Sequence, residues 1–211
     1  MKKNISVLVP CMALAIMSCA DFPEIPYLER TRIYGEPYLD TRDIYEYKTV
    51  VIGNQTWMAE NLIYNKDVEY VCYAGALENC KKYGPLYEFA VAKTICPIGW
   101  KLPSNEDWET LVKNSGGAVN SGHRLKAETE WEGGGNGSDL YGFKALPGGF
   151  IDEFNQSYQE GHMAFLWSST EVNEGIFARG ISSEKIEGVE IVRITVPKTG
   201  AKLSVRCLKE N

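Results

Sequence analysis

Strand-forming residues on both sides of a two-residue turn predict a β-hairpin in the first half of the chain. The runs 49–52 and 55–58 are rich in β-branched, aromatic and other apolar side chains. Gly53 and Asn54 separate them, and both residue types tolerate the positive φ angles that a tight hairpin turn requires. The pattern therefore predicts one antiparallel strand pair near the start of the domain.

The C-terminal part of the chain returns to short segments of strand-forming residues. In the last segment Leu203, Val205 and Cys207 alternate with Ser204 and Arg206, as expected for a strand that is buried on one face. No internal repeat is visible along the chain. The predicted strands are 164–169, 176–182, 189–196 and 202–208.

Two helices are predicted between the hairpin and these strands. The first covers 85–94, where Leu86 and Phe89 fall at helical spacing and a proline occupies the first turn. The second begins after Ser104, a favoured N-cap residue that acidic residues follow in the first turn. It should end at Gly116, because glycine commonly terminates helices.

Residues 115–163 are rich in glycine, most densely at 133–137. A loop region of this length inside a compact domain is usually functional. With the predicted strands and helices around it, the chain is expected to form one α+β domain over 47–211. That domain would contain two helices, short antiparallel sheets and a long glycine-rich loop region.

The N-terminus has the pattern of a bacterial lipoprotein signal. Lys2 and Lys3 precede an apolar run of about a dozen residues, and the small residue Ser18 stands before Cys19. Cleavage between Ser18 and Cys19 would remove residues 1–18 and free the amine and thiol of Cys19 for lipid attachment. The apolar run is shorter than the roughly 20 residues of a membrane-spanning helix. The alternative is an ordinary secretory signal in which the cysteine is incidental.

Residues 19–46 would follow as a lipid-anchored tether, since they are rich in Pro, Glu, Tyr and Arg without a clear period. The protein is then expected in the bacterial cell envelope, at the outer membrane on its periplasmic or surface face. Removal of 1–18, which holds two lysines and no acid, leaves 20 basic and 28 acidic residues, a net charge of −8. Nucleic-acid-binding proteins normally carry a basic stripe, so this acidic balance argues against a nucleic-acid partner. The expected partners are the membrane, through the lipid on Cys19, and a glycan or surface protein.

Four cysteines remain in the body of the mature chain: Cys72, Cys80, Cys96 and Cys207. An even number in an exported protein indicates two disulfides, and four cysteines allow three connectivities. We favour Cys72–Cys80, which would close a local loop, and Cys96–Cys207, which would span most of the domain. Neither pair has the C-x-x-C spacing of a zinc or redox motif.

Several catalytic sequence patterns are missing from the chain. It contains no G-x-S-x-G elbow and no phosphate-binding loop, and His123 and His162 are too far apart for an H-E-x-x-H site. Oxygen ligands on the glycine-rich loops are candidates for calcium, and a pair of these acids could instead serve a glycosidase. The simpler interpretation is that they set turn geometry through hydrogen bonds to the backbone. The calcium candidates are Asn136, Asp139, Asp152 and Glu153; no other cofactor is expected.

Aromatic and polar side chains gather in and beside the glycine-rich region. This combination suits a sugar ring or a peptide side chain. The alternative for each aromatic residue is that it anchors a long loop to the core. The candidate ligand-binding residues are Trp131, Asn136, Asp139, Tyr141, Phe150, Asp152, Glu153, Trp167, Ser168 and Glu171.

Ordered sequence blocks along the chain resemble the Fibrobacter succinogenes major paralogous domain family. Phe89 and Pro85 depart from the family, which often has Trp and Arg there. The matching blocks begin with Ile52-Gly53-Asn54-Gln55-Thr56-Trp57-Met58-Ala59-Glu60-Asn61-Leu62 and Tyr83-Gly84-x-Leu86-Tyr87. They continue with Cys96-Pro97-x-Gly99-Trp100-x-Leu102-Pro103-Ser104, Trp108-Glu109, Leu125-Lys126 and Asn136-Gly137-x-Asp139-x-Tyr141-Gly142-Phe143-x-Ala145-Leu146-Pro147-Gly148-Gly149. The last are Trp167-Ser168-Ser169-Thr170-Glu171 and Ser204-Val205-Arg206-Cys207.

The resemblance implies an exported bacterial domain, often carried by lipoproteins, with a fold similar to C-type lectins. That fold has a terminal hairpin, two helices, a long-loop region and a final strand tied back by a disulfide, a feature that Cys96–Cys207 would supply. The family has no well-established activity, so no catalytic residue is carried over. The Glu-Pro-Asn and Trp-Asn-Asp motifs of calcium-dependent lectins are missing from the sequence. Trp167-Ser168-Ser169 stands near the position of the second motif, Trp-Asn-Asp. Calcium-dependent sugar binding is therefore disfavoured.

Three functions remain open at this point. The favoured one is a non-catalytic, lectin-like module of an envelope lipoprotein that recognises a glycan or a protein. The second is a structural or accessory subunit of a surface assembly. The third is an enzyme related to the formylglycine-generating enzymes, which have a similar kind of fold and also end in an Arg-Cys strand. That chemistry requires reactive thiols, and we expect no enzymatic activity.

Overall fold

The computed structural model describes residues 32–210. The predicted signal 1–18 and the predicted lipidation site Cys19 lie outside the described residues, as does the first part of the predicted tether. Within 32–210 no helix is both long enough and apolar enough to cross a membrane. The predicted α+β class is confirmed, since helices are combined with several antiparallel sheets.

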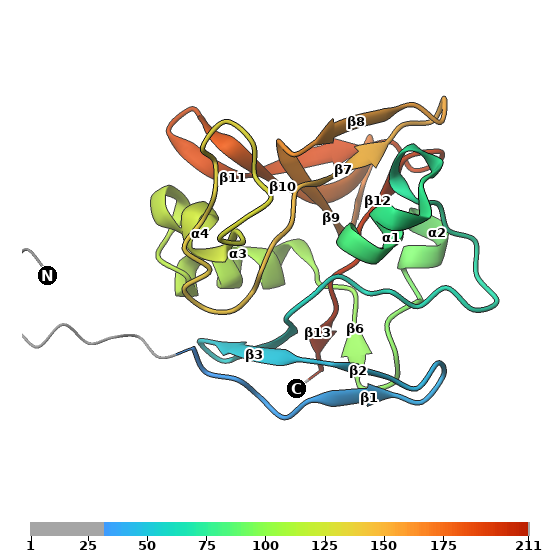
Figure 1. Ribbon diagram of the computed structural model, residues 1–211, viewed down its shortest axis with the longest axis horizontal. Coiled ribbons are helices and arrows are strands. Elements are labelled where there is room, and N and C mark those ends of the chain that lie inside the picture. The colour runs from blue at the N-terminus through green and yellow to red at the C-terminus, as the bar shows by residue number, and fades with distance from the viewer. Residues whose placement is uncertain (1–31, 211) are drawn as a thin grey trace, which may run out of the picture. The chain divides into compact units, whose positions relative to one another are not determined.

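A four-stranded sheet joins the start and the end of the domain. The predicted hairpin forms β3 (Thr49–Ile52) and β4 (Gln55–Met58), with Gly53 in the turn at φ 65°. β13 (Leu208–Lys209) pairs with β4 on one side and with β6 (Trp100–Lys101) on the other. The C-terminal residues therefore lie beside the hairpin, in the lower part of Figure 1.

A seven-stranded sheet occupies the upper part of Figure 1. Its strand order is β11-β10-β9-β7-β12-β5, and β8 pairs with β7. Its strand pairs are antiparallel except that of β7 and β9. The strands are β5 (Tyr87–Glu88), β7 (Gly148–Ile151), β8 (Ser157–Glu160), β9 (Met163–Val172), β10 (Gly175–Ile186), β11 (Val189–Val196) and β12 (Lys202–Leu203). The three predicted strands at 164–169, 176–182 and 189–196 are thus confirmed.

The α-helices of the described chain lie beside the two sheets, α3 and α4 on one side of Figure 1 and α1 and α2 on the other. The second predicted helix is α3. It begins with a capping box, in which Ser104 Oγ accepts the Asp107 N–H and the Asp107 carboxylate accepts the Ser104 N–H. The helices are α1 (Leu77–Tyr83), α2 (Phe89–Ala92), α3 (Asn105–Asn114) and α4 (Ala118–Leu125).

The predicted helix over 85–94 is wrong in its first half. There Tyr87 and Glu88 form β5, which pairs with β12 near the C-terminus, and only α2 is helical. The pairing partner lies far away in the sequence, so the local spacing of apolar residues does not reveal it. Helices α1 and α4 were not predicted, since both are short and α4 lies inside the glycine-rich region.

The last predicted strand, 202–208, is interrupted. β12 ends at Leu203, β13 begins at Leu208, and the residues between them cross from one sheet to the other. Along this crossing the backbone still accepts hydrogen bonds, for example from the Leu62 N–H to the Val205 carbonyl at 2.8 Å. The prediction of a strand buried on one face is wrong here, because Ser204 and Arg206 are buried as well as Leu203, Val205 and Cys207.

The segment expected to be a tether, 19–46, is folded over much of its described part. β1 (Tyr38–Asp40) pairs antiparallel with β2 (Tyr45–Tyr47). Arg42, in the connecting turn, donates to the Ile95 carbonyl at 2.8 Å and so ties the hairpin to a distant part of the chain. Proline and charge content alone cannot show such a contact, which is why the composition suggested an extended segment.

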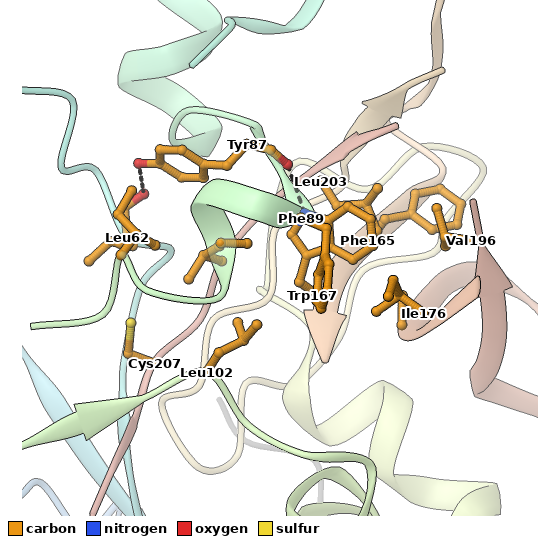
Figure 2. Close-up of a cluster of buried hydrophobic side chains, with 14 of the residues drawn as sticks. Leu62, Tyr87, Phe89, Leu102, Phe165, Trp167, Ile176, Val196, Leu203 and Cys207 are labelled. Atoms are coloured by element: carbon orange, nitrogen blue, oxygen red, sulfur yellow. Dashed lines mark hydrogen bonds between the residues drawn. The ribbon is translucent and has the colours of Figure 1, made fainter. Parts of the chain in front are cut away.

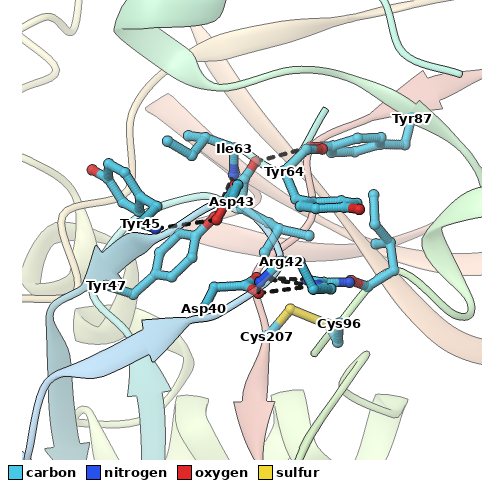
Figure 3. Close-up of polar contacts among 12 residues, drawn as sticks. Asp40, Arg42, Asp43, Tyr45, Tyr47, Ile63, Tyr64, Tyr87, Cys96 and Cys207 are labelled. Carbon is cyan, nitrogen blue, oxygen red and sulfur yellow. Dashed lines mark hydrogen bonds and ion pairs between the residues drawn. A yellow bond between two sulfur atoms is a disulfide. The ribbon is translucent and has the colours of Figure 1, made fainter. Parts of the chain in front are cut away.

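Arg42 holds this hairpin close to the disulfide between Cys96 and Cys207 (Figure 3). Its guanidinium binds Asp40 at 2.7 Å and lies over the ring of Tyr64, 4.0 Å from the centroid. Burial acts to raise the pKa of Asp40, but the hydrogen bonds and charge of Arg42 outweigh burial and lower that pKa below its ordinary value. Both predicted disulfides are present, the other being Cys72–Cys80.

The glycine-rich region 115–163 is not one long loop, because it contains α4, β7 and β8. Its glycines also have a packing role. A Cβ atom added at Gly135 would overlap Ser183, and one at Gly137 would overlap the Lys126 carbonyl oxygen. Glycine is therefore needed here because the backbone packs closely against its neighbours.

Aromatic side chains form the centre of the core (Figure 2). Trp167 is fully buried, and its indole N–H donates to the Tyr87 carbonyl at 2.7 Å. The Tyr87 hydroxyl donates in turn to the Leu62 carbonyl at 3.2 Å. In a second cluster Trp57 and Trp108 pack with ring centroids 4.9 Å apart. The polar atoms of the Trp167 and Tyr87 side chains are thus satisfied inside the protein, as burial requires.

Candidate functional site

The two tryptophans of the predicted ligand-binding set are buried. Trp131 is 4 % exposed, and its indole N–H donates to the Ala145 carbonyl at 3.1 Å. Trp167 is 0 % exposed and bound to Tyr87 as described above. Neither ring presents an open face to a ligand in this structure. Both fit the alternative interpretation, in which an aromatic residue anchors a loop to the core.

The calcium candidates do not come together, and three of them bind backbone N–H groups nearby. Asn136 Oδ1 accepts the Trp131 N–H at 3.0 Å. Asp139 Oδ1 and Asp152 Oδ1 each accept a backbone N–H, at 2.7 and 2.8 Å. Glu153 is exposed. Within 32–210 no three His, Cys, Asp or Glu side chains are grouped closely enough to hold a metal ion.

The other predicted residues are dispersed over the domain. Tyr141 is half-buried, and its hydroxyl donates to a carbonyl at the end of α3. Phe150 stacks on a neighbouring ring of β8, and Ser168 is buried. Glu171 pairs with Lys93 at 2.7 Å. Of the ten predicted residues, Asp139 lies at the cavities described next.

Three adjoining cavities form a row, which we call the groove. The first cavity, about 570 Å³, lies between α1, the loop after β4 and the loop before β7. The second cavity, about 510 Å³, shares Tyr45, Glu60 and Lys144 with the first and extends to the beginning of the described chain. The third cavity, about 330 Å³, shares Tyr70 with the first. Volumes of this size are typical of ligand sites.

Tyr45, Glu60 and Lys144 form the junction between the first and second cavities. The Tyr45 hydroxyl donates to Glu60 Oε2 at 3.1 Å, and burial together with the Glu60 charge raises the pKa of Tyr45. Lys144 has a φ of 52°, in the left-handed region, and its N–H donates to Asp139 Oδ1 at 2.7 Å. A non-glycine residue in this conformation costs of order 1 kcal/mol, so the exposed lysine is held here at the expense of stability.

Charges of both signs line the second cavity. Arg32 binds Glu128 at 2.6 Å, and its Nε donates to the Asp139 carbonyl at 2.8 Å. Burial raises the pKa of the Asp139 carboxyl, although the hydrogen bond from Lys144 and the charge of Arg32 oppose it. Lys48 also lines this cavity, and among the described residues its ammonium group has no ion-pair or hydrogen-bond partner.

Helix α1 forms one wall of the first cavity, and the Cys72–Cys80 disulfide ties this helix to the segment before it. Lys82 pairs with Glu130 at 2.5 Å, and the hydrogen bond between them raises the pKa of Lys82. Leu77, 68 % exposed, and Tyr70, 37 % exposed, add apolar surface. The wall thus combines apolar side chains with ammonium groups at its rim.

Asn61 connects the lining of the first cavity to a fully buried arginine. Arg206 donates to Asn61 Oδ1 at 2.8 and 3.1 Å and to the Phe143 carbonyl at 2.5 Å. Burial lowers the pKa of Arg206 to about 9, while the charges of Glu60 and Asp139 act to raise it. Neutral oxygen atoms therefore hold this cation directly behind the groove.

The groove itself was not predicted from the sequence. Tyr45 and Lys48 lie in or beside the segment interpreted as a tether, and helix α1 was not expected at all. The cluster of tyrosines and charges at 43–48 was the one local signal, and it was assigned to linker composition. The rest of the lining comes from loops that become neighbours after folding.

These features define a disulfide-stapled α+β domain, a class consistent with export to an oxidising compartment. The chain belongs to the family of the Fibrobacter succinogenes major domain, whose model matches residues 50–209. The resemblance stated from the sequence is thereby confirmed. No curated protein and no solved structure matches the chain.

Proposed function

We propose that this protein is a non-catalytic binding module of the bacterial cell envelope that recognises a glycan or a protein ligand in the groove. The observation that carries the proposal is the row of three cavities joined by shared lining residues. Ligand sites are commonly concave and combine apolar walls with a few polar groups, as the groove does.

The polar groups of the junction support recognition of a ligand from solution. Lys48 and Lys144 line the groove, and neither ammonium group has a partner among the described residues. Glu60 keeps a carboxylate beside them. A hydrophilic ligand can therefore gain hydrogen bonds here without breaking ion pairs of the two lysines.

The proposal includes a C-type-lectin-like fold and a lipid anchor on Cys19. Two features support the fold: the hairpin β3–β4 pairs with the C-terminal strand β13, and Cys96–Cys207 ties that strand back. The signal pattern of the sequence supports the anchor, and the disulfides are consistent with the envelope. The outer membrane is the expected location.

A thiol-based enzyme is less favoured by the same structure. Such an enzyme, related to those that generate formylglycine, needs at least one reduced cysteine. All four cysteines of the described chain are paired in disulfides. A structural subunit of a surface assembly remains the alternative, and self-association would distinguish it from a monomeric binding module.

The test uses the mature chain with Cys19→Ser, so that the lipid is omitted, on glycan arrays and on immobilised envelope proteins. Lys144→Ala and Tyr70→Ala should weaken any binding. Lys185→Ala and Tyr158→Ala, exposed residues that line none of the three cavities, are the matched controls. Equal binding by groove and control variants would place the site elsewhere. A large, stable homomeric complex without ligand binding would favour the assembly subunit.

A further inference from the structure

The cavities of the groove form a linear series. The third cavity adjoins the first through Tyr70, and the first adjoins the second through Tyr45, Glu60 and Lys144. The second and third share no lining residue, so the first lies between them. A compact small molecule would need one cavity of this size, whereas an elongated ligand can use all three.

Tyrosine rings stand along this series. Tyr70, 37 % exposed, lies between the third and first cavities, and the half-buried Tyr45 lies between the first and second. Tyr34, 58 % exposed, lines the second cavity. A phenol ring offers an apolar face and a polar hydroxyl, which matches a pyranose ring with its C–H face and its hydroxyl rim.

Hydrogen-bond donors and acceptors line the first and second cavities together with these rings. Lys48, Lys144 and Asn65 can donate, while Glu46 and Glu60 can accept. Sugar hydroxyls both donate and accept, so such mixed lining can satisfy them.

The ion pairs around the first cavity reduce its charge. Lys81 binds Glu78 at 2.9 Å, and Lys82 binds Glu130 at 2.5 Å. The lysines of this wall are therefore not free to attract a polyanion. Lys48 and Lys144, which have no such partner among the described residues, share the groove lining with the carboxylates of Glu46 and Glu60, so charges of both signs remain. This mixture favours a neutral ligand over a polyanion or a polycation.

An extended peptide fits the groove less well. Peptides commonly bind by adding a strand to an exposed sheet edge. At the third cavity the sheet edge is formed by β5. Directly before β5 this edge is already paired, because Val71 and Leu86 exchange two backbone hydrogen bonds, at 3.0 and 2.9 Å. The backbone groups that a peptide strand would use at this point are thus occupied.

We infer that the ligand is a neutral, linear polysaccharide that occupies the three cavities as successive subsites; this inference rests on the proposed function. Each cavity binds one part of the polysaccharide, and the tyrosine side chains lie between or beside these subsites. Affinity must then increase with oligosaccharide length until the groove is filled.

Titration calorimetry of the mature Cys19→Ser chain tests this with linear gluco-, xylo- and manno-oligosaccharides of increasing length, in α and β linkages. For at least one series the Kd should fall with length and then level off. Tyr34→Ala and Tyr70→Ala, in different cavities, should each weaken the longest oligomer by about tenfold, the size expected for an exposed aromatic contact. Tyr158→Ala should leave the Kd unchanged, and circular dichroism confirms that each variant is folded.

The outcomes separate this inference from the proposed function. A disaccharide that binds as tightly as the longest oligomer, with binding lost in the groove variants, overturns the polymer inference and leaves the binding module standing. Saccharide binding that survives both tyrosine substitutions overturns the groove as the site and the proposed function with it. Binding only to charged oligosaccharides or to a peptide, or to none of the neutral series, also overturns the inference.

Discussion

Arg206 donates to Asn61 Oδ1 from both Nε and Nη2, at 3.1 and 2.8 Å, although the two residues are 145 positions apart in the sequence. Asn61 uses its own amide group to donate to the Tyr83 carbonyl at 2.8 Å. One buried side chain thus links the C-terminal segment, the loop after β4 and the end of α1. Because α1 is a wall of the groove, this link also positions the site.

Replacement of Asn61 by alanine should destabilise the protein by about 3 kcal/mol, because it leaves guanidinium donors of a buried charge without an acceptor. The free energy of unfolding, measured with urea, checks this. Asn65→Ala is the matched control, since Asn65 is exposed, and should change stability by no more than about 0.5 kcal/mol. Equal losses in the two variants would show that Arg206 finds other acceptors.

Trp167→Ala should cost about 3–5 kcal/mol of stability, because the ring is fully buried and its N–H binds the Tyr87 carbonyl. Trp131→Ala should reduce stability by a similar amount, because this ring is also buried and its N–H binds the Ala145 carbonyl. Denaturant unfolding of both variants measures the loss. Tyr158→Ala, on the exposed side of β8, should stay within about 1 kcal/mol. Fully stable tryptophan variants would contradict the assignment of these rings to the core.

The features that the sequence predicted well depend on neighbouring residues. Gly53 and Asn54 define the hairpin turn, and Ser104 with Asp107 forms the capping box, all within a few positions. The even count of cysteines indicated two disulfides but left three connectivities open; the favoured pairing is the one observed, and the family resemblance supported its long-range member, Cys96–Cys207. For the turn and the capping box, local chemistry leaves few alternatives.

The features that the sequence missed depend on distant partners. Tyr87 lies inside the predicted helix 85–94, yet it pairs with Leu203 as a strand. Arg42 lies in the segment predicted as a tether, but in the folded chain it donates to the Ile95 carbonyl. The groove was missed for the same reason, since Tyr45 and Lys144 meet only in the folded chain. An aromatic and polar composition pointed to Trp131, but tertiary packing determines which rings remain exposed.

The two disulfides should contribute unequally to stability. Cys96–Cys207 spans 111 residues and Cys72–Cys80 spans 8, so the chain-entropy relation gives about 5 and about 2.5 kcal/mol. Two double variants test this: one replaces Cys96 and Cys207 by serine, the other Cys72 and Cys80. Their free energies of unfolding, measured in denaturant without reductant, give the two losses of stability. Removal of Cys72–Cys80 should also weaken ligand binding, because this disulfide holds the α1 wall of the groove. Equal losses in the two variants would contradict the entropic argument.

Tyr47 and Tyr87 should make the protein sensitive to alkaline pH. Both phenols are buried, and burial raises the pKa of each well above its ordinary value. Above about pH 10 the unfolded chain loses these protons while the folded chain keeps them. Their contribution to stability is therefore complete below about pH 10 and is lost as the pH rises through the folded-state pKa.

Tyr87→Phe should therefore flatten the alkaline loss of stability. The variant loses the hydrogen bonds from the Tyr87 hydroxyl to the Leu62 and Tyr64 carbonyls, so it should be less stable at neutral pH. This deficit should be constant up to about pH 9 and shrink above about pH 10, because the variant has one phenol fewer to ionise on unfolding. Urea unfolding across this range measures the effect, and parallel curves for the two proteins throughout would show that Tyr87 titrates alike in both states.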